Sequence, residues 1–293
     1  MPSHSRQPLR QGPPRRRPLR RTRAASVALV TACAPVALAG CALSSSDQQS
    51  ILHRHSLVIG VKGDQPGLGM KVNGHYQGFD VDVATYVARR LGVPASRITF
   101  RTTPSSVREK AIEDGTVDMV VATYSITPAR KTQITFAGPY YVAHQDTLVR
   151  TNDRSIANVH NLAKKKICAV TGSNSWRRIT DERSIPAVPV DVATYSDCMP
   201  LLTSGKIDAF STDDLILAGF AAGHPDVHLI GEPFTDEKYG IGMRKGDLAG
   251  CEAVNRILTR MYQDGSAGRF LNHWFANTGA KLTTSVPQFE GCS

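Results

Sequence analysis

Apolar runs of strand length alternate with helical stripes along the first half of the chain. Residues 57–61 form an apolar, β-branched run, and residues 79–91 carry apolar side chains at helical spacing. A short run at 98–101, a helical stripe at 107–112 and a buried run ending at Ala122 complete a βαβαβ order. We therefore predict an α/β fold with a mostly parallel sheet flanked by helices, whose ligands collect at the carboxyl ends of the strands.

A similar passage recurs later in the chain. The sequence IEDGTVDM at residues 112–119 resembles LTSGKIDA at residues 202–209, and each is typical of a helix end, a Gly cap and a strand opening with Asp. Five residues beyond each Asp lie Thr123 and Asp213. The recurrence predicts two α/β lobes that each deliver a polar group from an equivalent strand, unless two common helix-to-strand connections are alike by chance.

Residues 118–130 predict a carboxylate site. A buried run there ends in hydroxyl side chains, and a Thr-Pro pair typical of a helix start follows it. Arg130 then falls in the first helical turn, where its planar guanidinium suits a carboxylate beside helix N–H groups. Thr123 and Ser125 are two residues apart and would share one side of an extended strand. The alternative is an ordinary strand-turn-helix with a solvated Arg.

A second anion-holding element is predicted where the strand at 166–170 ends. The turn that follows contains Ser173, Asn174 and Ser175 and opens a helix, so its backbone N–H groups could hold an oxygen of an anion. The turn lacks the spaced glycines and the Lys-Ser/Thr pair of a P-loop. Simple capping by Ser173 or Ser175 is the alternative.

Two cations follow the first two predicted strands. Lys62 lies at the end of the first strand and Arg101 at the end of the second, and the two would be close in a parallel sheet. Such a pair suits a second carboxylate on a ligand, in addition to the one predicted at Arg130. Solvated surface side chains are the alternative for both residues. Tyr124 either lines the same pocket or is a buried structural side chain.

The amino-terminal region has the three parts of a lipoprotein signal. Residues 1–23 hold eight Arg and no acidic residue, residues 24–38 are small and apolar, and the sequence LAGC ends at Cys41. We predict a signal peptide over residues 1–40, lipidation of Cys41 and a flexible tether over residues 41–50. The expected location is the extracytoplasmic face of the cell membrane. The Arg-rich segment does not decide between the general and the twin-arginine export routes.

Removal of the signal changes the charge of the protein. The whole chain carries 35 basic and 25 acidic residues, and loss of eight Arg leaves 27 basic residues, a net charge of +2 for residues 41–293. The basic excess therefore belongs to the export signal, and we expect no nucleic-acid partner.

The cysteines agree with export. After Cys33 is removed and Cys41 is committed to lipid, four remain in an oxidising compartment: Cys168, Cys198, Cys251 and Cys292. They permit three pairings, of which we favour Cys168–Cys198 and Cys251–Cys292, the two short loops in sequence order. No CxxC spacing is present and no His lies at ligand spacing, so we expect no metal site.

The chain resembles the polar amino-acid binding proteins of ABC importers, the bacterial extracellular solute-binding protein family 3, and within it glutamate-binding lipoproteins. Six stretches carry the resemblance: DQPGLG at 64–69, GFDVDVATYVA at 78–88, VDMVVATYSITPARK at 117–131, FAGPYY at 136–141, IDAFSTDD at 207–214 and KYGIGMRKGD at 238–247. The resemblance implies a two-lobed type II periplasmic-binding-protein fold without a cofactor. It assigns the ligand α-carboxylate to Arg130, helped by Ser125 and the N–H groups of 173–175, and the α-ammonium to Asp213 with Thr123.

Irregular stretches at residues 138–141 and 234–240 are the predicted crossings between the lobes. They give a two-strand hinge, with lobe 1 at residues 51–142 and 238–293 and lobe 2 at residues 143–237. Capture would be closure of the lobes over the ligand. Where many relatives place an aromatic residue against the ligand side chain, this chain is polar near Gln65, which disfavours an apolar ligand.

Three classes of function remain open at this point. The first is a monomeric, lipid-anchored subunit that delivers an amino acid to permease subunits, with glutamate first, then aspartate, glutamine and asparagine. The second is a sensor whose closed form is recognised by a membrane partner. The third is an enzyme resembling certain dehydratases of this fold, for which His144 near the hinge is the acid-base candidate.

Overall fold

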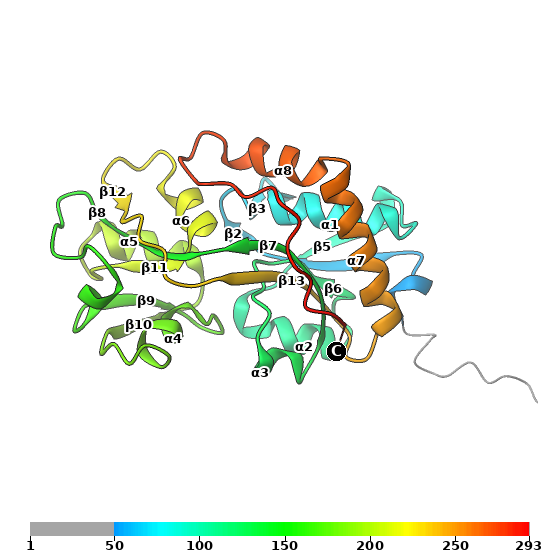
Figure 1. Ribbon diagram of the computed structural model, residues 1–293, viewed down its shortest axis with the longest axis horizontal. Coiled ribbons are helices and arrows are strands. Elements are labelled where there is room, and N and C mark those ends of the chain that lie inside the picture. Colours follow the sequence, from blue (N-terminus) through cyan, green and yellow to red (C-terminus); the bar gives the residue numbers. More distant parts are fainter. Residues whose placement is uncertain (1–49, 293) are drawn as a thin grey trace, which may run out of the picture. The chain divides into compact units, whose positions relative to one another are not determined.

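A computed structural model describes residues 50–292, which belong to one compact unit (Figure 1). The predicted signal peptide, Cys41 and residues 41–49 of the predicted tether lie outside the described residues. Ser50, the last residue of that tether, is buried, and its hydroxyl donates a 2.7 Å hydrogen bond to the Asp247 carboxylate. The described part of the chain therefore begins with a residue that is bound to lobe 1.

Strands and helices alternate through most of the unit. The helices are α1 (Phe79–Arg90), α2 (Arg108–Glu113), α3 (Pro128–Lys131), α4 (Ser175–Thr180), α5 (Cys198–Thr203), α6 (Asp214–Ala221), α7 (Leu248–Gln263) and α8 (Ser266–Phe275). The strands are β1 (Leu57–Val61), β2 (Asp64–Gln65), β3 (Gly69–Val72), β4 (His75–Gln77), β5 (Ile98–Thr102), β6 (Met119–Val120), β7 (Thr135–Ala143), β8 (Gln145–Arg150), β9 (Lys166–Val170), β10 (Val188–Val192), β11 (Phe210–Asp213), β12 (Val227–Leu229) and β13 (Glu237–Met243).

Lobe 1 is built on a five-stranded sheet in the order β5-β1-β6-β13-β7. β1 pairs in parallel with β5 and β6, whereas β13 runs antiparallel to both of its neighbours. Apolar side chains of β1 and of the buried face of α1, including Ile59, Phe79 and Val83, enter the main core. The predicted α/β order is confirmed, and the antiparallel strand is the one by which the chain returns from lobe 2.

Lobe 2 contains a parallel pair, β9 with β10, and an antiparallel sheet in the order β11-β8-β12. A single parallel bridge between Ile167 and Ala209 links the pair to the segment before β11. Ile167, Ile179 and Ala209 lie in a separate buried cluster, so this lobe has apolar packing of its own.

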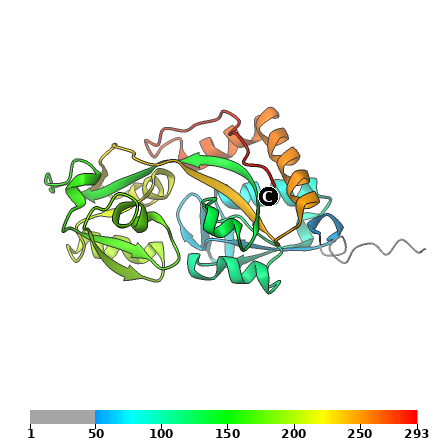
Figure 2. The same cartoon turned by 60° about the horizontal axis from the view of Figure 1, so that its bottom comes forward.

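β7 and β13 connect the lobes as one antiparallel ribbon, with Ala143 opposite Glu237 at one end and Thr135 opposite Met243 at the other (Figure 2). The two-strand hinge is confirmed. The stretches predicted to be irregular, residues 138–141 and 234–240, instead fall largely inside these strands. Gly and Pro are tolerated in β7 because β7 is an edge strand of its sheet. The exact lobe boundaries at residues 142 and 238 stay a prediction.

Both favoured disulfides are present. Cys168 of β9 is bonded to Cys198 of α5, with 5.7 Å between their Cα atoms. Cys251 of α7 is bonded to Cys292, with a Cα separation of 5.8 Å. The first lies within lobe 2, and the second fixes the end of the chain to α7.

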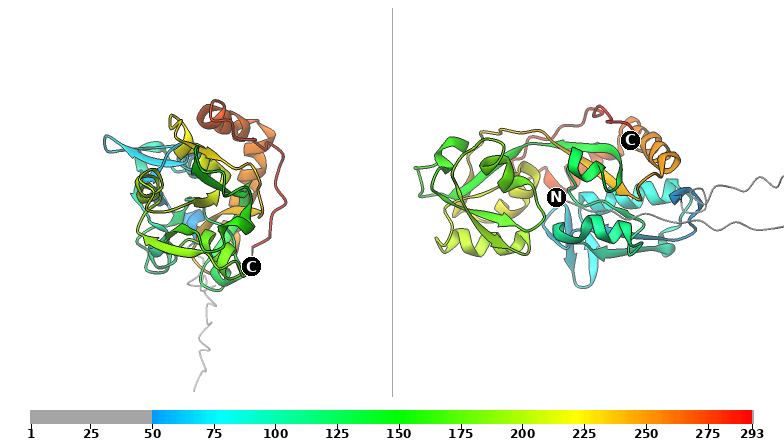
Figure 3. Two further views of the ribbon diagram at one scale, coloured as in Figure 1. Left: turned by 90° about the vertical axis from the view of Figure 1, so that its left-hand side faces the viewer. Right: turned by 90° about the horizontal axis from the view of Figure 1, so that it is seen from below.

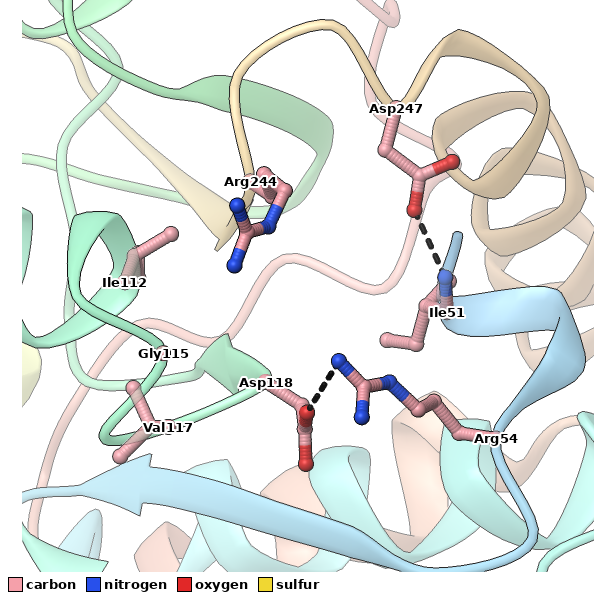
Figure 4. Close-up of a pocket in the computed structure, with 8 residues that line it drawn as sticks. All are labelled: Ile51, Arg54, Ile112, Gly115, Val117, Asp118, Arg244 and Asp247. Atoms are coloured by element: carbon pink, nitrogen blue, oxygen red, sulfur yellow. Dashed lines mark hydrogen bonds and ion pairs between the residues drawn. The ribbon is translucent and has the colours of Figure 1, made fainter. Parts of the chain in front are cut away.

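A small cavity of about 10 Å³ marks the place where the amino-terminal turn (η2, Ile51–His53) meets lobe 1 (Figure 4). The Asp247 carboxylate accepts a 2.8 Å hydrogen bond from the Ile51 N–H, and Arg54 lies 3.5 Å from Asp118. This volume is about that of one water molecule. The cavity is therefore part of the docking of the turn and is too small for a ligand.

Among residues 50–292, no helix has the length and apolarity needed to cross a bilayer.

Candidate ligand-binding site

Arg130 lies at the meeting of the two lobes and is 8% exposed. Thr127 caps α3 and accepts a hydrogen bond from the Arg130 N–H, as predicted. The guanidinium donates to the Ser125 carbonyl at 2.9 Å and, across the cleft, to the Gly172 carbonyl at 3.1 Å, while its Nε is 3.3 Å from Glu109. A guanidinium has five N–H donors, so these three contacts leave two for an anion.

Arg108 is a second buried guanidinium that the sequence analysis did not single out. It is 2% exposed, and it donates a 3.0 Å hydrogen bond to the Ala122 carbonyl. Its Nε has no hydrogen-bond partner within the described residues. Burial and then repulsion from Arg108 lower the pKa of Arg130 to about 10, so Arg130 remains charged at neutral pH. The spacing from Arg108 to the buried Ile112 is one helical turn and was the available signal.

Tyr124 lies beneath these two cations. The Arg108 guanidinium is 4.1 Å from the centre of its ring and that of Arg130 is 5.1 Å away. The ring is fully buried and packs edge-on against Phe136. Tyr124 is therefore a buried side chain that contacts both guanidinium groups through cation–π interactions.

Lys62 is the third buried cation of lobe 1. Its Nζ donates a 2.5 Å hydrogen bond to the Ser105 hydroxyl and lies 5.4 Å from the Tyr195 ring of lobe 2. Burial, followed by repulsion from Arg108, lowers the pKa of Lys62 well below its usual value. A ligand carboxylate beside Lys62 would counter both effects.

Arg101 is not brought into this cluster. It is exposed on β5 opposite Gly60 of β1, and its side chain makes no hydrogen bond or ion pair among residues 50–292. The register places Arg101 beside Gly60, two residues before Lys62, on the edge strand of the sheet, so its side chain reaches solvent instead of the cleft. The expectation that Arg101 partners Lys62 is therefore wrong, and Arg108 occupies that role in space.

Thr123 and Ser125 are both buried, but the segment between them is not an extended strand. β6 ends at Val120, and Thr123 has a φ of 45°. Its N–H donates to the Asp80 carboxylate at 2.9 Å, and its hydroxyl contacts the Gln65 side-chain oxygen at 3.2 Å. The expectation that the two side chains share one side of a strand is therefore wrong, since the left-handed residue redirects the chain. The Gln65 Nε2 is a buried donor without a partner in the described part of the chain.

Asp213 ends β11 and is buried in lobe 2. Its carboxylate accepts a 2.6 Å hydrogen bond from the Tyr239 hydroxyl of β13. Burial, and then repulsion from Glu237, raise the pKa of Asp213 well above its usual value, and the Tyr239 hydrogen bond only partly opposes this. A cationic group at this carboxylate would stabilise its charged form.

The turn before α4 faces Arg130, although its N–H groups are partly used. The Ser173 backbone N–H donates to the Val170 carbonyl, and the side-chain amide of Asn174 donates to the Glu237 carboxylate at 3.1 Å. The Ser175 hydroxyl pairs with that of Thr212. No side chain caps α4, so the structure does not show simple capping by Ser173 or Ser175, which was the alternative to anion binding at this turn.

Two cavities lie between the lobes. One of about 610 Å³ is lined by Glu109, Arg130, Ser173 and Asn174, among others. A second, of about 160 Å³, is lined by residues that include Lys62, Ser105 and Tyr195. Asp213 lines neither cavity. His144 lines neither of these two cavities. It pairs with Asp236 at 3.0 Å, and no hydrogen bond or ion pair joins it to Asp213.

The lobes touch directly at this cleft. The Tyr195 N–H donates to the Asp64 carboxylate at 2.7 Å, in addition to the bond from Arg130 to Gly172. Gly172 has a φ of +80°, and a Cβ there would lie 2.5 Å from the Ser106 backbone. The close approach of the lobes therefore depends on glycine at this position.

Two α/β lobes, a two-strand hinge and a cleft with fixed charges define a protein of the type II solute-binding fold. The model of the bacterial extracellular solute-binding proteins, family 3, matches residues 57–277, and the chain belongs to this family. The predicted resemblance is confirmed. The family consists of extracellular binding proteins, so the chain is a solute-binding protein and not an enzyme.

Relatives of known name agree with this assignment. The chain is 39% identical to the glutamate-binding protein GluB of Corynebacterium glutamicum, over 91% of this chain and 95% of that protein. It is 32% identical to the glutamine-binding protein GlnH of Bacillus subtilis, over 87% and 98%. Among solved structures, an ancestral arginine-binding protein bound to arginine superposes with a TM-score of 0.70 at 31% identity, covering 76% of this chain and 99% of that one.

Proposed function

We propose that this protein captures glutamate outside the cytoplasm and delivers it to the permease subunits of an ABC importer, with aspartate, glutamine and asparagine as the next candidates. The names of GluB and GlnH support an acidic or amide amino acid. The observation that carries the proposal is the cluster of three buried cations, Lys62, Arg108 and Arg130. Burial, and then repulsion from Arg108, lower the pKa values of Lys62 and Arg130.

Two of these cations exceed what a single carboxylate needs. Arg130, at the larger cavity, is the proposed partner of the α-carboxylate, with Ser125 and residues 173–175 around it. Lys62 and Arg108 are the proposed partners of the distal carboxylate, because Lys62 lines the smaller cavity and the Arg108 Nε has no hydrogen-bond partner in the described part of the chain. A buried cation without a partner is costly, and a second anionic group on the ligand offsets this cost.

We assign the α-ammonium to Asp213 together with Thr123, as the family resemblance implies. Burial, and then repulsion from Glu237, raise the pKa of Asp213 well above its usual value, so a cation there would stabilise its charged form. The bond from Arg130 to Gly172 spans the cleft, so the lobes must separate to admit a ligand. Contacts to both lobes would then favour the closed form by the difference in their affinity for ligand.

Cationic ligands fit this site poorly. Arginine is bound by one of the structural relatives, but its guanidinium would face Lys62 and Arg108 at close range. Like charges at such separations disfavour binding. Gln65, with its unpaired amide donor, also favours a ligand oxygen over a ligand N–H.

Calorimetric titration of the purified protein, freed of carried-over ligand by unfolding and refolding, tests the proposal. We expect the order glutamate, aspartate, glutamine, asparagine, with arginine not bound. Binding of arginine more tightly than glutamate would contradict the proposed ligand.

Anchoring through Cys41 is the remaining part of the proposal, and the sequence LAGC at residues 38–41 supports it. We expect Cys41→Ala to abolish lipid labelling and to release the protein from the membrane fraction. Membrane retention of this variant at the unmodified level would contradict the anchor.

A further inference from the structure

The carboxyl-terminal segment continues beyond the region that the family model matches. Residues 278–292, which we call the strap, follow α8 and contain no helix or strand. The strap runs along β7 and β13 in the views of Figures 1 and 3 and ends at the disulfide between Cys292 and Cys251. Leu282 and Phe289 pack against the main core, so the strap is a packed element.

Glu290 fixes the strap to the hinge ribbon and to the helix of the carboxylate site. Its N–H donates to the Gly138 carbonyl of β7 at 3.0 Å. Its carboxylate lies 2.9 Å from Lys238 of β13 and 3.1 Å from Lys131 of α3. Lys131 directly follows Arg130, so one carboxylate links the hinge to the helix that carries the main anion-binding residue.

The other end of the strap faces lobe 2. Residues between Gly279 and Thr283 line a cavity of about 380 Å³ together with His144, Asp146 and Asp214. The strap is therefore held on lobe 1 by Glu290 and by the disulfide, and it borders lobe 2 through this cavity. Rotation of the lobes about β7 and β13 would change the gap that the strap spans.

The charge state of Glu290 agrees with a holding role. Burial opposes its ionisation, but hydrogen bonds from Lys238 and Lys131 outweigh this effect and keep the pKa of Glu290 below its usual value. The carboxylate is therefore ionised at neutral pH, and its side chain is only 26% exposed. An inert tail would not place its acidic residue between two lysines from separate elements.

We infer that the strap restrains the hinge, and that Glu290 is a positioning residue that keeps β7, β13 and α3 in the arrangement in which the lobes touch. The inference rests on the proposed capture function. The strap slows separation of the lobes and so lengthens the time for which ligand is held.

Two variants test the strap. Glu290→Gln keeps the size of the side chain and removes the charge that holds both lysines, and the pair Cys251→Ser with Cys292→Ser frees the end. The matched control is Glu252→Gln, because Glu252 also forms an ion pair, with Arg256, but both of these side chains are exposed, Glu252 by 67%. Each protein is measured for thermal midpoint, glutamate dissociation rate by stopped flow, and amide hydrogen exchange of residues 138–143 and 237–241 without ligand.

We expect dissociation about threefold faster for Glu290→Gln and about tenfold faster for the cysteine pair, as the loss of one to two exposed ion pairs or of a cross-link implies. Hinge exchange should accelerate in both variants and stay unchanged in Glu252→Gln. Unchanged dissociation and unchanged hinge exchange in folded variants would overturn the inference. Absence of glutamate binding in the unmodified protein would contradict the proposed function alone, since the exchange measurement needs no ligand.

Discussion

The two walls of the cleft carry opposite unmet charges. Lobe 1 contributes three buried cations, and burial followed by repulsion from Arg108 lowers the pKa values of Lys62 and Arg130. Lobe 2 contributes Asp213, a buried carboxylate whose pKa is raised well above its usual value. Neither wall is electrostatically satisfied without a partner. Under the proposed function, a ligand with two carboxylates and one ammonium would meet both needs at once, and recognition would then be coupled to closure.

Removal of the central charge on each wall should have the largest effect. Arg130→Ala leaves the α-carboxylate without its guanidinium, and Asp213→Ala leaves the ammonium without its counter-charge. Each should weaken every amino acid by about 2–5 kcal/mol, because the remaining charge is buried on closure. Titration calorimetry of both variants measures this, and loss of less than tenfold in affinity in both would contradict the assignment.

Removal of a distal cation should separate glutamate from glutamine. Arg108→Met should weaken glutamate by about 1–3 kcal/mol more than glutamine, because only glutamate leaves a desolvated charge unpaired. Lys62→Met should show the same bias more weakly, since its lowered pKa makes it a poorer cation.

Arg101→Met is the matched control for this comparison. Arg101 is exposed and outside the cluster, so its loss should not alter the preference. Equal losses of glutamate and glutamine affinity in Arg108→Met would remove the cations of lobe 1 from specificity.

The disulfide of lobe 2, between Cys168 and Cys198, should contribute to the stability of that lobe. Cys168→Ser with Cys198→Ser opens a 30-residue separation, for which the chain-entropy model predicts a loss of about 3–4 kcal/mol in the free energy of unfolding. Urea unfolding measured at lobe 2 should show this loss. A change of less than about 1 kcal/mol would mean that apolar packing alone holds the lobe.

The pH dependence should be the smallest effect near neutrality. Asp213 must be ionised to hold an ammonium, and its raised pKa means that the free protein retains this proton at higher pH than usual. Glutamate affinity should therefore rise with pH up to the raised pKa, by at most tenfold per unit, and binding below that pKa should release a proton. In the absence of ligand, the same shift stabilises the fold at low pH, and this contribution is lost as pH rises.

Calorimetry in buffers of different ionisation enthalpy measures the released proton. Asp213→Asn should abolish the release. Proton release that is equal in the two proteins would assign it to another group.

Much of the fold was predictable because it rests on local periodicity. The stripes at residues 79–91 and 107–112 correspond to α1 and α2 within about a residue, and the disulfides follow from four cysteines in two short loops. The site was less predictable. Thr123 adopts a left-handed conformation that no strand pattern reveals, and the role of Arg108 depends on which helical face meets the cleft. Arg101 was misassigned because β5 is the edge strand of the sheet, where a side chain can reach solvent instead of the cleft.

Asp247 has a consequence for the reach of the protein. Asp247 caps α7 and also binds Ser50 and Ile51. The proposed tether to a lipidated Cys41 would therefore start at a fixed point on lobe 1. The nine steps from Cys41 to Ser50 extend to about 30 Å at most. If Cys41 is lipidated as proposed, confinement to so shallow a layer would raise the concentration of the protein around a membrane partner above that of a freely diffusing protein. The Asp247 carboxylate, which fixes the first turn of the chain, would then set how far from the membrane the cleft can lie.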